Sequence, residues 1–180
     1  MRWLNVAFFG AALAVCISAN AQSPTYGIGR APTPEEIRSY DTSVGPAGKE
    51  LPPGRGTARE GAAIFVQKCA SCHGATATEG PADRLVGGQG SLASDRPLKT
   101  VGSYWPYATT VWDYVNRAMP LNNPGSLAPN EVYSVTAFIL FRNGIVQETD
   151  VIDRDTLPKV RMPNRDGFVS DARPDWRDSR

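Results

Sequence analysis

Cys69-Ala70-Ser71-Cys72-His73 is the stretch of sequence that decides the fold. It has the C-x-x-C-H spacing, in which two thiols lie three residues apart and an imidazole follows directly. Residues three apart on a helix share a face, so both thiols can add to the two vinyl groups of one porphyrin. The imidazole then reaches the iron from the proximal side. The motif predicts one covalent haem c, attached at Cys69 and Cys72 and ligated by His73.

Other uses of a cysteine pair fit this sequence less well. A dithiol redox pair of the thioredoxin type belongs in a βαβ setting, and no such pattern surrounds Cys69. A structural zinc ion takes four ligands, whereas the sequence after residue 21 holds two cysteines and one histidine. A simple disulfide would leave His73 unexplained. Haem attachment is therefore the interpretation that accounts for the whole motif.

The second axial ligand is expected to be a methionine. His73 is the only histidine in the sequence, and both cysteines after residue 21 are already used. Met119 stands at the end of a predicted helix and precedes Pro120, which stops the helix and can turn the thioether toward the iron. Met162 and an open position are alternatives, and any methionine can be ordinary core. We predict Met119, whose thioether would favour reduced iron and close the coordination sphere.

Further residues are candidates for the haem surroundings. The Gly80-Pro81 pair, with Pro81 as a predicted haem contact, is expected to set a backbone carbonyl against the second ring nitrogen of His73. Leu85 is apolar and is expected to touch the porphyrin. Tyr104 and Trp105 carry polar tips that would meet the propionates. Each of these side chains is equally compatible with an ordinary core position.

Three helices are predicted, over residues 57–72, 108–118 and 129–143. The first opens with a capping box formed by Thr57 and Glu60. The second carries an apolar face at helical spacing, made of Val111, Tyr114, Val115 and Ala118.

The third helix has both a start and a stop signal. Pro129 suits its first position, and Gly144 is a natural C-terminal stop. Ala128 is a poor N-cap residue. No period-two strand pattern or internal repeat is present, so the pattern predicts an all-α core.

Residues 1–21 are predicted to be a signal peptide. A positive start at Arg2 precedes an uncharged apolar run, and Ala19-Asn20-Ala21 is an A-x-A cleavage site. The mature chain would begin at Gln22 in the periplasm. An uncleaved membrane anchor and a lipoprotein attached through Cys16 are the alternatives.

The mature chain would be electrically balanced. Removing Arg2 from the 19 basic residues leaves 18, against 18 acidic residues. This balance argues against nucleic acid or an anionic membrane surface as partner. No apolar run long enough to span a bilayer remains after residue 21.

The chain divides into an arm, a domain and a tail. Residues 22–56 are rich in proline and glycine, which exclude a long helix and predict an extended arm, either disordered or lying on the domain or a partner. Residues 57–144 are the predicted domain. Residues 145–180 form an irregular charged tail, in which Phe168 and Trp176 are candidates for docking it onto the domain or a partner.

The domain resembles class I cytochrome c. Gly61 and Phe65 match the glycine and the aromatic residue of that family's first helix, and Phe138 matches the aromatic residue of the last helix. Arg117-Ala118-Met119-Pro120 is similar to the axial methionine segment. The resemblance implies an all-α class I fold around one covalent haem, with the first and last helices crossing closely at the glycine.

A narrower resemblance covers nearly the whole mature chain. The segments 51–57, 99–110 and 162–168 look like those of the cytochrome subunits that accompany molybdenum sulfite or sulfane dehydrogenases of sulfur-oxidising bacteria. The resemblance implies that a molybdopterin subunit donates electrons and that a downstream cytochrome or oxidase accepts them. The better-known sulfane dehydrogenase cytochrome carries two haems, whereas this chain has one C-x-x-C-H motif.

Electron transfer without catalysis is the expected function. A free-standing carrier for another dehydrogenase is an alternative, although such a carrier needs neither the arm nor the tail. A haem enzyme with an open distal site is a second alternative, which a Met119 ligand would exclude. The sequence leaves open whether sulfite or a sulfane is the ultimate electron source.

Overall fold

The structure is a computed structural model that describes residues 26–170. The chain separates into two compact units with the boundary after Ser39. The predicted signal peptide and Trp176 lie outside the described residues. Within 26–170, none of the helices combines the length and apolar character that crossing a membrane requires.

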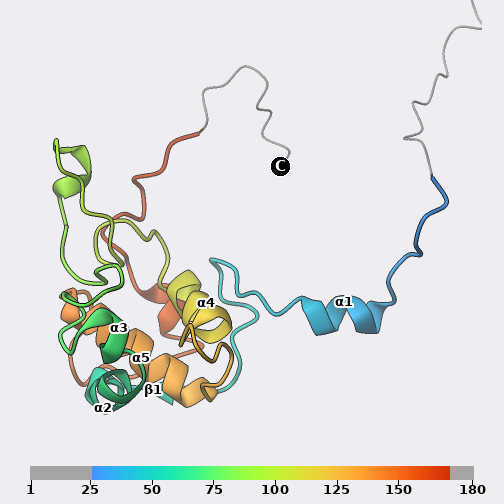
Figure 1. Ribbon diagram of the computed structural model, residues 1–180, viewed down its shortest axis with the longest axis horizontal. Helices are drawn as coiled ribbons and strands as arrows, with labels where there is room; N and C mark the ends of the chain where they lie inside the picture. Colours follow the sequence, from blue (N-terminus) through green and yellow to red (C-terminus); the bar gives the residue numbers. More distant parts are fainter. Residues whose placement is uncertain (1–25, 171–180) are drawn as a thin grey trace, which may run out of the picture. The chain divides into compact units, whose positions relative to one another are not determined.

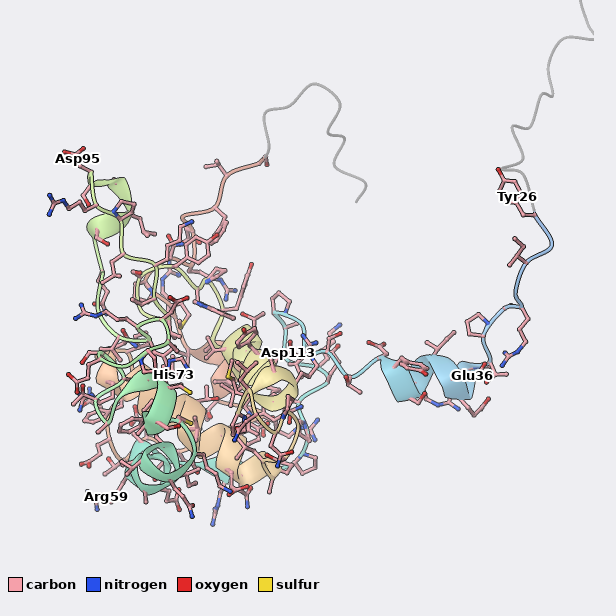
Figure 2. The ribbon with its side chains drawn as sticks, viewed as in Figure 1. Tyr26, Glu36, Arg59, His73, Asp95 and Asp113 are labelled. Atoms are coloured by element: carbon pink, nitrogen blue, oxygen red, sulfur yellow. The ribbon has the colours of Figure 1, made fainter. Side chains whose placement is uncertain are left out.

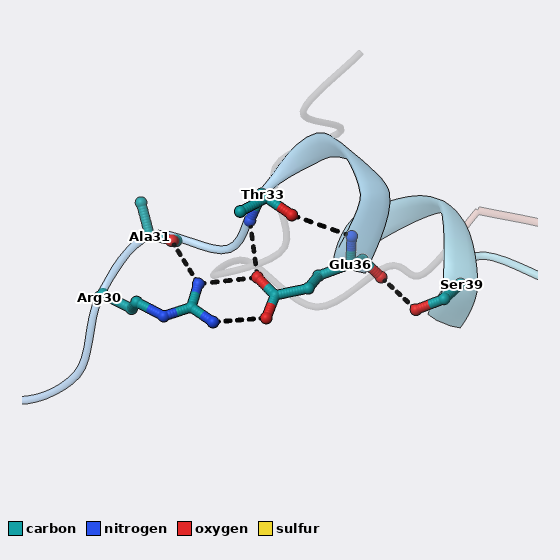
Figure 3. A network of polar contacts seen from close by, with 5 residues as sticks. All are labelled: Arg30, Ala31, Thr33, Glu36 and Ser39. Carbon is teal, nitrogen blue, oxygen red and sulfur yellow. Dashed lines mark hydrogen bonds and ion pairs between the residues drawn. The ribbon is translucent and has the colours of Figure 1, made fainter.

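The first unit contains most of helix α1 (Pro34–Tyr40). Thr33 and Glu36 cap it reciprocally: Thr33 Oγ1 accepts from the Glu36 amide at 3.2 Å, and the Glu36 carboxylate accepts from the Thr33 amide at 2.8 Å (Figure 3). The Arg30 guanidinium also binds this carboxylate and lowers the pKa of Glu36 to about 2. No residue of α1 is buried, so local capping rather than packing forms this helix.

The second unit is built from helices α2 (Ala58–Lys68), α3 (Ala70–His73), α4 (Ala108–Ala118) and α5 (Pro129–Arg142) (Figure 1). Two short 3₁₀ helices, η1 (Ser91–Ala93) and η2 (Leu157–Lys159), lie in the connections. The strands β1 (Arg55–Gly56) and β2 (Ile152–Asp153) form one small antiparallel ladder, pairing Arg55 with Asp153. The predicted all-α architecture is confirmed, with this ladder as a minor addition.

Helices α2 and α5 cross closely at Gly61. A Cβ atom on Gly61 would lie 1.9 Å from the Ser134 carbonyl oxygen, so only glycine allows this approach. One turn further on, the rings of Phe65 and Phe138 pack with centroids 4.9 Å apart. The helix crossing predicted from these residues is therefore confirmed.

The first predicted helix is interrupted. It was expected to run to about Cys72, but α2 ends at Lys68 and α3 begins at Ala70. Cys69 between them has φ −123° and ψ −28°, outside helical geometry. The capping box at the start is present, with the Thr57 amide donating to Glu60 at 2.8 Å.

The buried face of α4 differs from the predicted one. Val111 and Val115 are buried as expected, but Tyr114 is 47% exposed. Trp112, which is 1% exposed, packs against Tyr133 of α5 instead. The chain preceding β1 also reaches α4, where the Val44 amide donates to Asp113 and the Thr109 hydroxyl donates to the Pro46 carbonyl.

Residues 44–56 lie on the domain. Val44 and Leu51 are part of the hydrophobic core. The Val44 amide donates to Asp113 at 2.7 Å, and the Tyr133 hydroxyl donates to the Pro52 carbonyl at 2.9 Å. The second half of the predicted arm is thus an ordered, integral part of the fold.

Helix α5 is closed at both ends. The Glu131 carboxylate accepts from the Ala128 amide at 2.8 Å, which compensates for the poor N-cap residue. Gly144 has φ 70°, and the Ile145 amide donates back to the Leu140 carbonyl at 3.0 Å. This is the Schellman ending that the Gly144 stop signal predicts.

Candidate haem site

The C-x-x-C-H motif forms one short helical turn. The amides of Cys72 and His73 both donate to the Cys69 carbonyl, at 3.1 and 3.0 Å. Cys69 is half-buried and Cys72 is exposed, and both thiols are free. The chain leaves the turn at Gly74, whose φ of 73° favours glycine. The turn therefore carries two free thiols and the imidazole on one compact segment.

Burial raises the pKa of the Cys69 thiol to about 11, with a smaller contribution from the neighbouring Cys72. The thiol of Cys69 is therefore protonated at neutral pH. Reactive cysteines of disulfide oxidoreductases have lowered pKa values instead. This electrostatic setting is unlike that of a thioredoxin-type redox pair.

The imidazole of His73 is oriented by the loop that follows the motif. Its Nδ1 atom lies 2.9 Å from the Asp83 carbonyl oxygen, which can accept an Nδ1–H hydrogen bond. The remaining nitrogen, Nε2, is then the atom with a free lone pair for a metal ion. Figure 2 shows His73 at the end of α3 and Asp95 at the far end of the long loop that follows.

The acceptor at His73 differs from the prediction. A carbonyl of Gly80-Pro81 was expected, but that of Asp83 lies there. Gly80 packs against the Cys72 carbonyl, where a Cβ would lie only 2.3 Å away, and the Ala82 amide donates to the same carbonyl at 2.9 Å. Residue 82 is therefore still bonded to Cys72, and the chain reaches the imidazole one residue later, at Asp83. The haem contact predicted for Pro81 stays a prediction.

Two loop segments beyond His73 are joined to each other. The Val101 amide donates to the Leu85 carbonyl at 3.3 Å, and the Thr100 hydroxyl donates to the Gly87 carbonyl at 2.6 Å. Leu85 itself is half-buried against the core. These bonds join the loop that runs from His73 to Gly87 to the segment 99–105. The two joined segments are here called the wall.

The same segment reaches the helix that ends at Met119. Trp105 packs edge-on against Tyr114 of α4, with ring centroids 5.7 Å apart. Met119 follows α4 with extended backbone, φ −125° and ψ 151°, and is half-buried. A continuous series of contacts therefore links His73, Leu85, Trp105 and the Met119 helix. The sequence predicted each of these as a haem ligand or haem contact on separate grounds.

Asn143 ties this wall to the end of α5. Its Nδ2 donates to the carbonyls of Leu85 and Ile139, at 3.1 and 2.9 Å, and its Oδ1 accepts from the Gly87 amide at 3.1 Å. Sequence analysis missed this residue, as it missed Asp83. Both act through contacts between distant segments, and neither stands in a recognisable motif.

The other methionine predicted as an alternative ligand lies in the core. Met162 is 1% exposed and belongs to the hydrophobic cluster. Tyr104, a predicted propionate contact, packs against Phe168 and lies under the Lys99 ammonium. Phe168 thus attaches this part of the C-terminal tail to the domain.

The donor set fits a covalently attached haem. It consists of two free thiols one helical turn apart, an imidazole with one nitrogen engaged by a carbonyl, and a half-buried thioether on the connected helix. Among residues 26–170, histidine, cysteine, aspartate and glutamate side chains form no group of three or more suited to a metal ion.

Comparisons with known proteins agree with this fold and donor set. Residues 56–139 match the family model described as subunit III of cbb3-type cytochrome c oxidase. The chain belongs to the cytochrome c family, whose domain transfers electrons and carries haem c.

A more specific likeness is to a chain in the crystal structure of the sulfane dehydrogenase SoxCD from Paracoccus pantotrophus. The two chains are 44% identical with a TM-score of 0.74, and the match covers 82% of this chain and 73% of the other. The predicted resemblance to sulfane dehydrogenases is confirmed. No curated protein sequence matches this chain significantly.

Proposed function

We propose that this protein is a periplasmic monohaem cytochrome c that accepts electrons from a molybdenum-containing sulfite or sulfane dehydrogenase. In this proposal Cys69 and Cys72 hold the haem covalently, and His73 and Met119 are the axial ligands. A haem held in this way supplies a single iron centre that is reduced and oxidised by one electron.

One observation carries the site assignment: the His73 ring is fixed through Nδ1 to the Asp83 carbonyl, on the same turn as two free thiols. This bond sets the tautomer and the ring orientation, and it increases the basicity of the ligating nitrogen. Met119 is proposed as the second ligand because it ends the helix that the Trp105 contact joins to the same wall. A closed coordination sphere makes this chain an electron carrier and leaves substrate chemistry to the partner.

The partner is proposed from the likeness to SoxCD, which is a sulfane dehydrogenase. The match extends over 82% of the chain, well beyond the 56–139 region of the general family model. A molybdopterin subunit would carry out the two-electron oxidation. The haem would then be reduced twice per substrate, passing each electron to a downstream cytochrome or oxidase.

Haem attachment is tested on the protein isolated from its native periplasm. Intact mass should equal the chain from Gln22 plus one haem, and a pyridine haemochrome spectrum should show two thioether links. Cys69→Ala should leave one thioether link and shift the spectrum accordingly. A wild-type mass without haem would refute the assignment.

The electron donor is tested on the complex isolated gently through a C-terminal tag. Sulfite, or a sulfane-bearing persulfide, is added to the oxidised preparation and haem reduction is followed by absorbance. Rapid reduction that disappears when the chain is separated from its partner supports the proposal. If neither compound reduces a haem that dithionite reduces normally, the dehydrogenase assignment is wrong.

A further inference from the structure

Residues 162–168, here called the C-terminal strap, lie across residues 104–107, here called the aromatic corner. Asn164 Nδ2 donates to the Tyr104 carbonyl at 2.8 Å. The Arg165 guanidinium lies over the Tyr107 ring, 4.2 Å from its centroid. Phe168 packs edge-on against the Tyr104 ring at 5.3 Å. Figure 1 shows this last coloured segment of the ribbon beside the loop that precedes α4.

The strap is built to hold these side chains in place. Met162 anchors its start in the core, and the Arg165 amide donates back to the Met162 carbonyl at 3.1 Å. The Gly167 amide donates to the Asn164 carbonyl at 3.2 Å. A Cβ on Gly167 would lie 1.8 Å from Asn164 Oδ1, so glycine is required for the asparagine to curl onto this turn.

The aromatic corner connects two parts of the candidate haem site. On one side, the Tyr104 amide donates to the Thr100 carbonyl at 3.0 Å, and Thr100 is bonded to the loop containing Leu85. On the other side, Tyr107 is the residue from which α4 starts. Contacts that hold the aromatic corner in place therefore also hold the wall against α4, the helix that ends at Met119.

We propose that the C-terminal strap is part of the haem site, with Asn164 and Arg165 as positioning residues that hold the aromatic corner and limit the access of water to the haem. This inference rests on the proposed function. It extends the site beyond the 56–139 region of the family model, because all strap residues follow that region.

The expected effect is on the reduction potential. Exposure of a haem to water favours the more highly charged oxidised iron, so loosening the corner lowers the potential. Losing the Asn164 bond removes about 1 kcal/mol of net local stabilisation, which corresponds to roughly fivefold faster amide exchange at Tyr104.

The test compares variants in the haem-loaded chain. Asn164→Ala and Arg165→Ala should each lower the potential in a spectroelectrochemical titration and speed amide exchange at Tyr104, with haem content unchanged. Arg165→Lys should recover part of the potential, since an ammonium also binds an aromatic face. Gly167→Ala, which displaces the Asn164 side chain, should reproduce Asn164→Ala.

Arg154→Ala is the matched charge control. Arg154 is exposed and lies outside the strap, so its loss removes one positive charge from the same tail without touching the strap or the corner. If Asn164→Ala, Arg165→Ala and Gly167→Ala show the potential and exchange rate of Arg154→Ala, the strap has no positioning role. A wild-type chain without haem would instead refute the proposed function, which the haemochrome spectrum detects independently.

Discussion

At the scale of single residues, the candidate site depends on hydrogen bonds that join separate segments of the chain. Asp83 supplies a carbonyl to His73, and Asn143 bonds to Leu85, which is 58 positions earlier in the chain. These residues orient the groups that the proposed haem would contact. The Asp83 bond comes from the main chain and is independent of the side chain. Substitution of Asn143 is expected to affect geometry and stability, whereas substitution of a ligand affects the iron directly.

Met119→Ala should abolish the methionine–iron charge-transfer band and lower the reduction potential strongly, because the thioether favours reduced iron. The measurements are the absorbance spectrum of the oxidised protein and a redox titration. Met162→Leu is the matched control. It replaces a core side chain by one of similar volume and should keep the band. A band retained in Met119→Ala and lost in Met162→Leu would reverse the ligand assignment.

Asn143→Ala should lower the free energy of unfolding by about 2–3 kcal/mol. The substitution leaves the Gly87 amide without its partner and removes one of the two hydrogen bonds to the Leu85 carbonyl, at a position where Asn143 is 8% exposed. Chemical denaturation measures the change. The exposed Asn122→Ala is the control and should stay within about 0.5 kcal/mol of wild type. Equal stability of both variants would contradict the role given to Asn143.

At the scale of elements, the fold rests on the α2–α5 crossing and on the attachment of residues 44–48 to α4. Backbone contact governs the crossing, since Gly61 touches the Ser134 carbonyl. A charged hydrogen-bond cluster governs the attachment: Asp113 accepts from Arg117 at 2.9 Å and from the Val44 amide at 2.7 Å. The crossing should therefore respond to a change in side-chain volume at Gly61, and the attachment should respond to a change in pH.

Gly61→Ala should destabilise the domain by roughly 2 kcal/mol or more, because the new methyl group forces the two helices apart despite a better helix propensity. Thermal or chemical unfolding tests this. Gln67→Ala, at an exposed position of the same helix, controls for the change in composition and should be nearly neutral. A stable Gly61→Ala variant would show that the crossing is wider than described.

Asp113 should make stability depend on pH. Burial raises its pKa, but the hydrogen bonds from Arg117 and the Val44 amide outweigh burial, so the net pKa is lowered. The folded pKa lies below the unfolded value near 4, so this contribution is present above that pH and is lost as pH falls through the folded pKa. Asp113→Asn should unfold more easily at pH 7 and lose less stability on acidification. Parallel pH profiles for both proteins would contradict this.

At the scale of the whole molecule, the two units are expected to contribute differently to stability. No residue of α1 is buried, whereas Val44 and Leu51 belong to the core. The first unit is thus held together by local bonds such as those of Glu36 (Figure 3).

A haem-loaded chain lacking residues 22–39 should therefore unfold at the same temperature as the mature chain. Removal of residues 22–50 should lower the unfolding temperature, because it deletes Val44 and its bond to Asp113. Melting followed by circular dichroism measures both. A lower melting temperature for the shorter deletion would show that the first unit stabilises the domain.

The sequence by itself determined the features that are encoded locally. The C-x-x-C-H spacing nominated the haem ligands, the Thr57 capping box and the Gly144 stop marked helix ends, and Gly61 with Phe65 and Phe138 implied the helix crossing. These signals span a few residues or match a family pattern, so they can be read without knowing the fold.

Only the tertiary structure decided which distant segments meet. It selected the Asp83 carbonyl for His73, Trp112 rather than Tyr114 for the buried face of α4, and Asn143 and the C-terminal strap as supports of the wall. Proline-rich composition predicted an extended arm, but not that residues 44–56 would pack on α4 and α5. Such contacts depend on chain path and side-chain packing, which local propensity and periodicity do not encode.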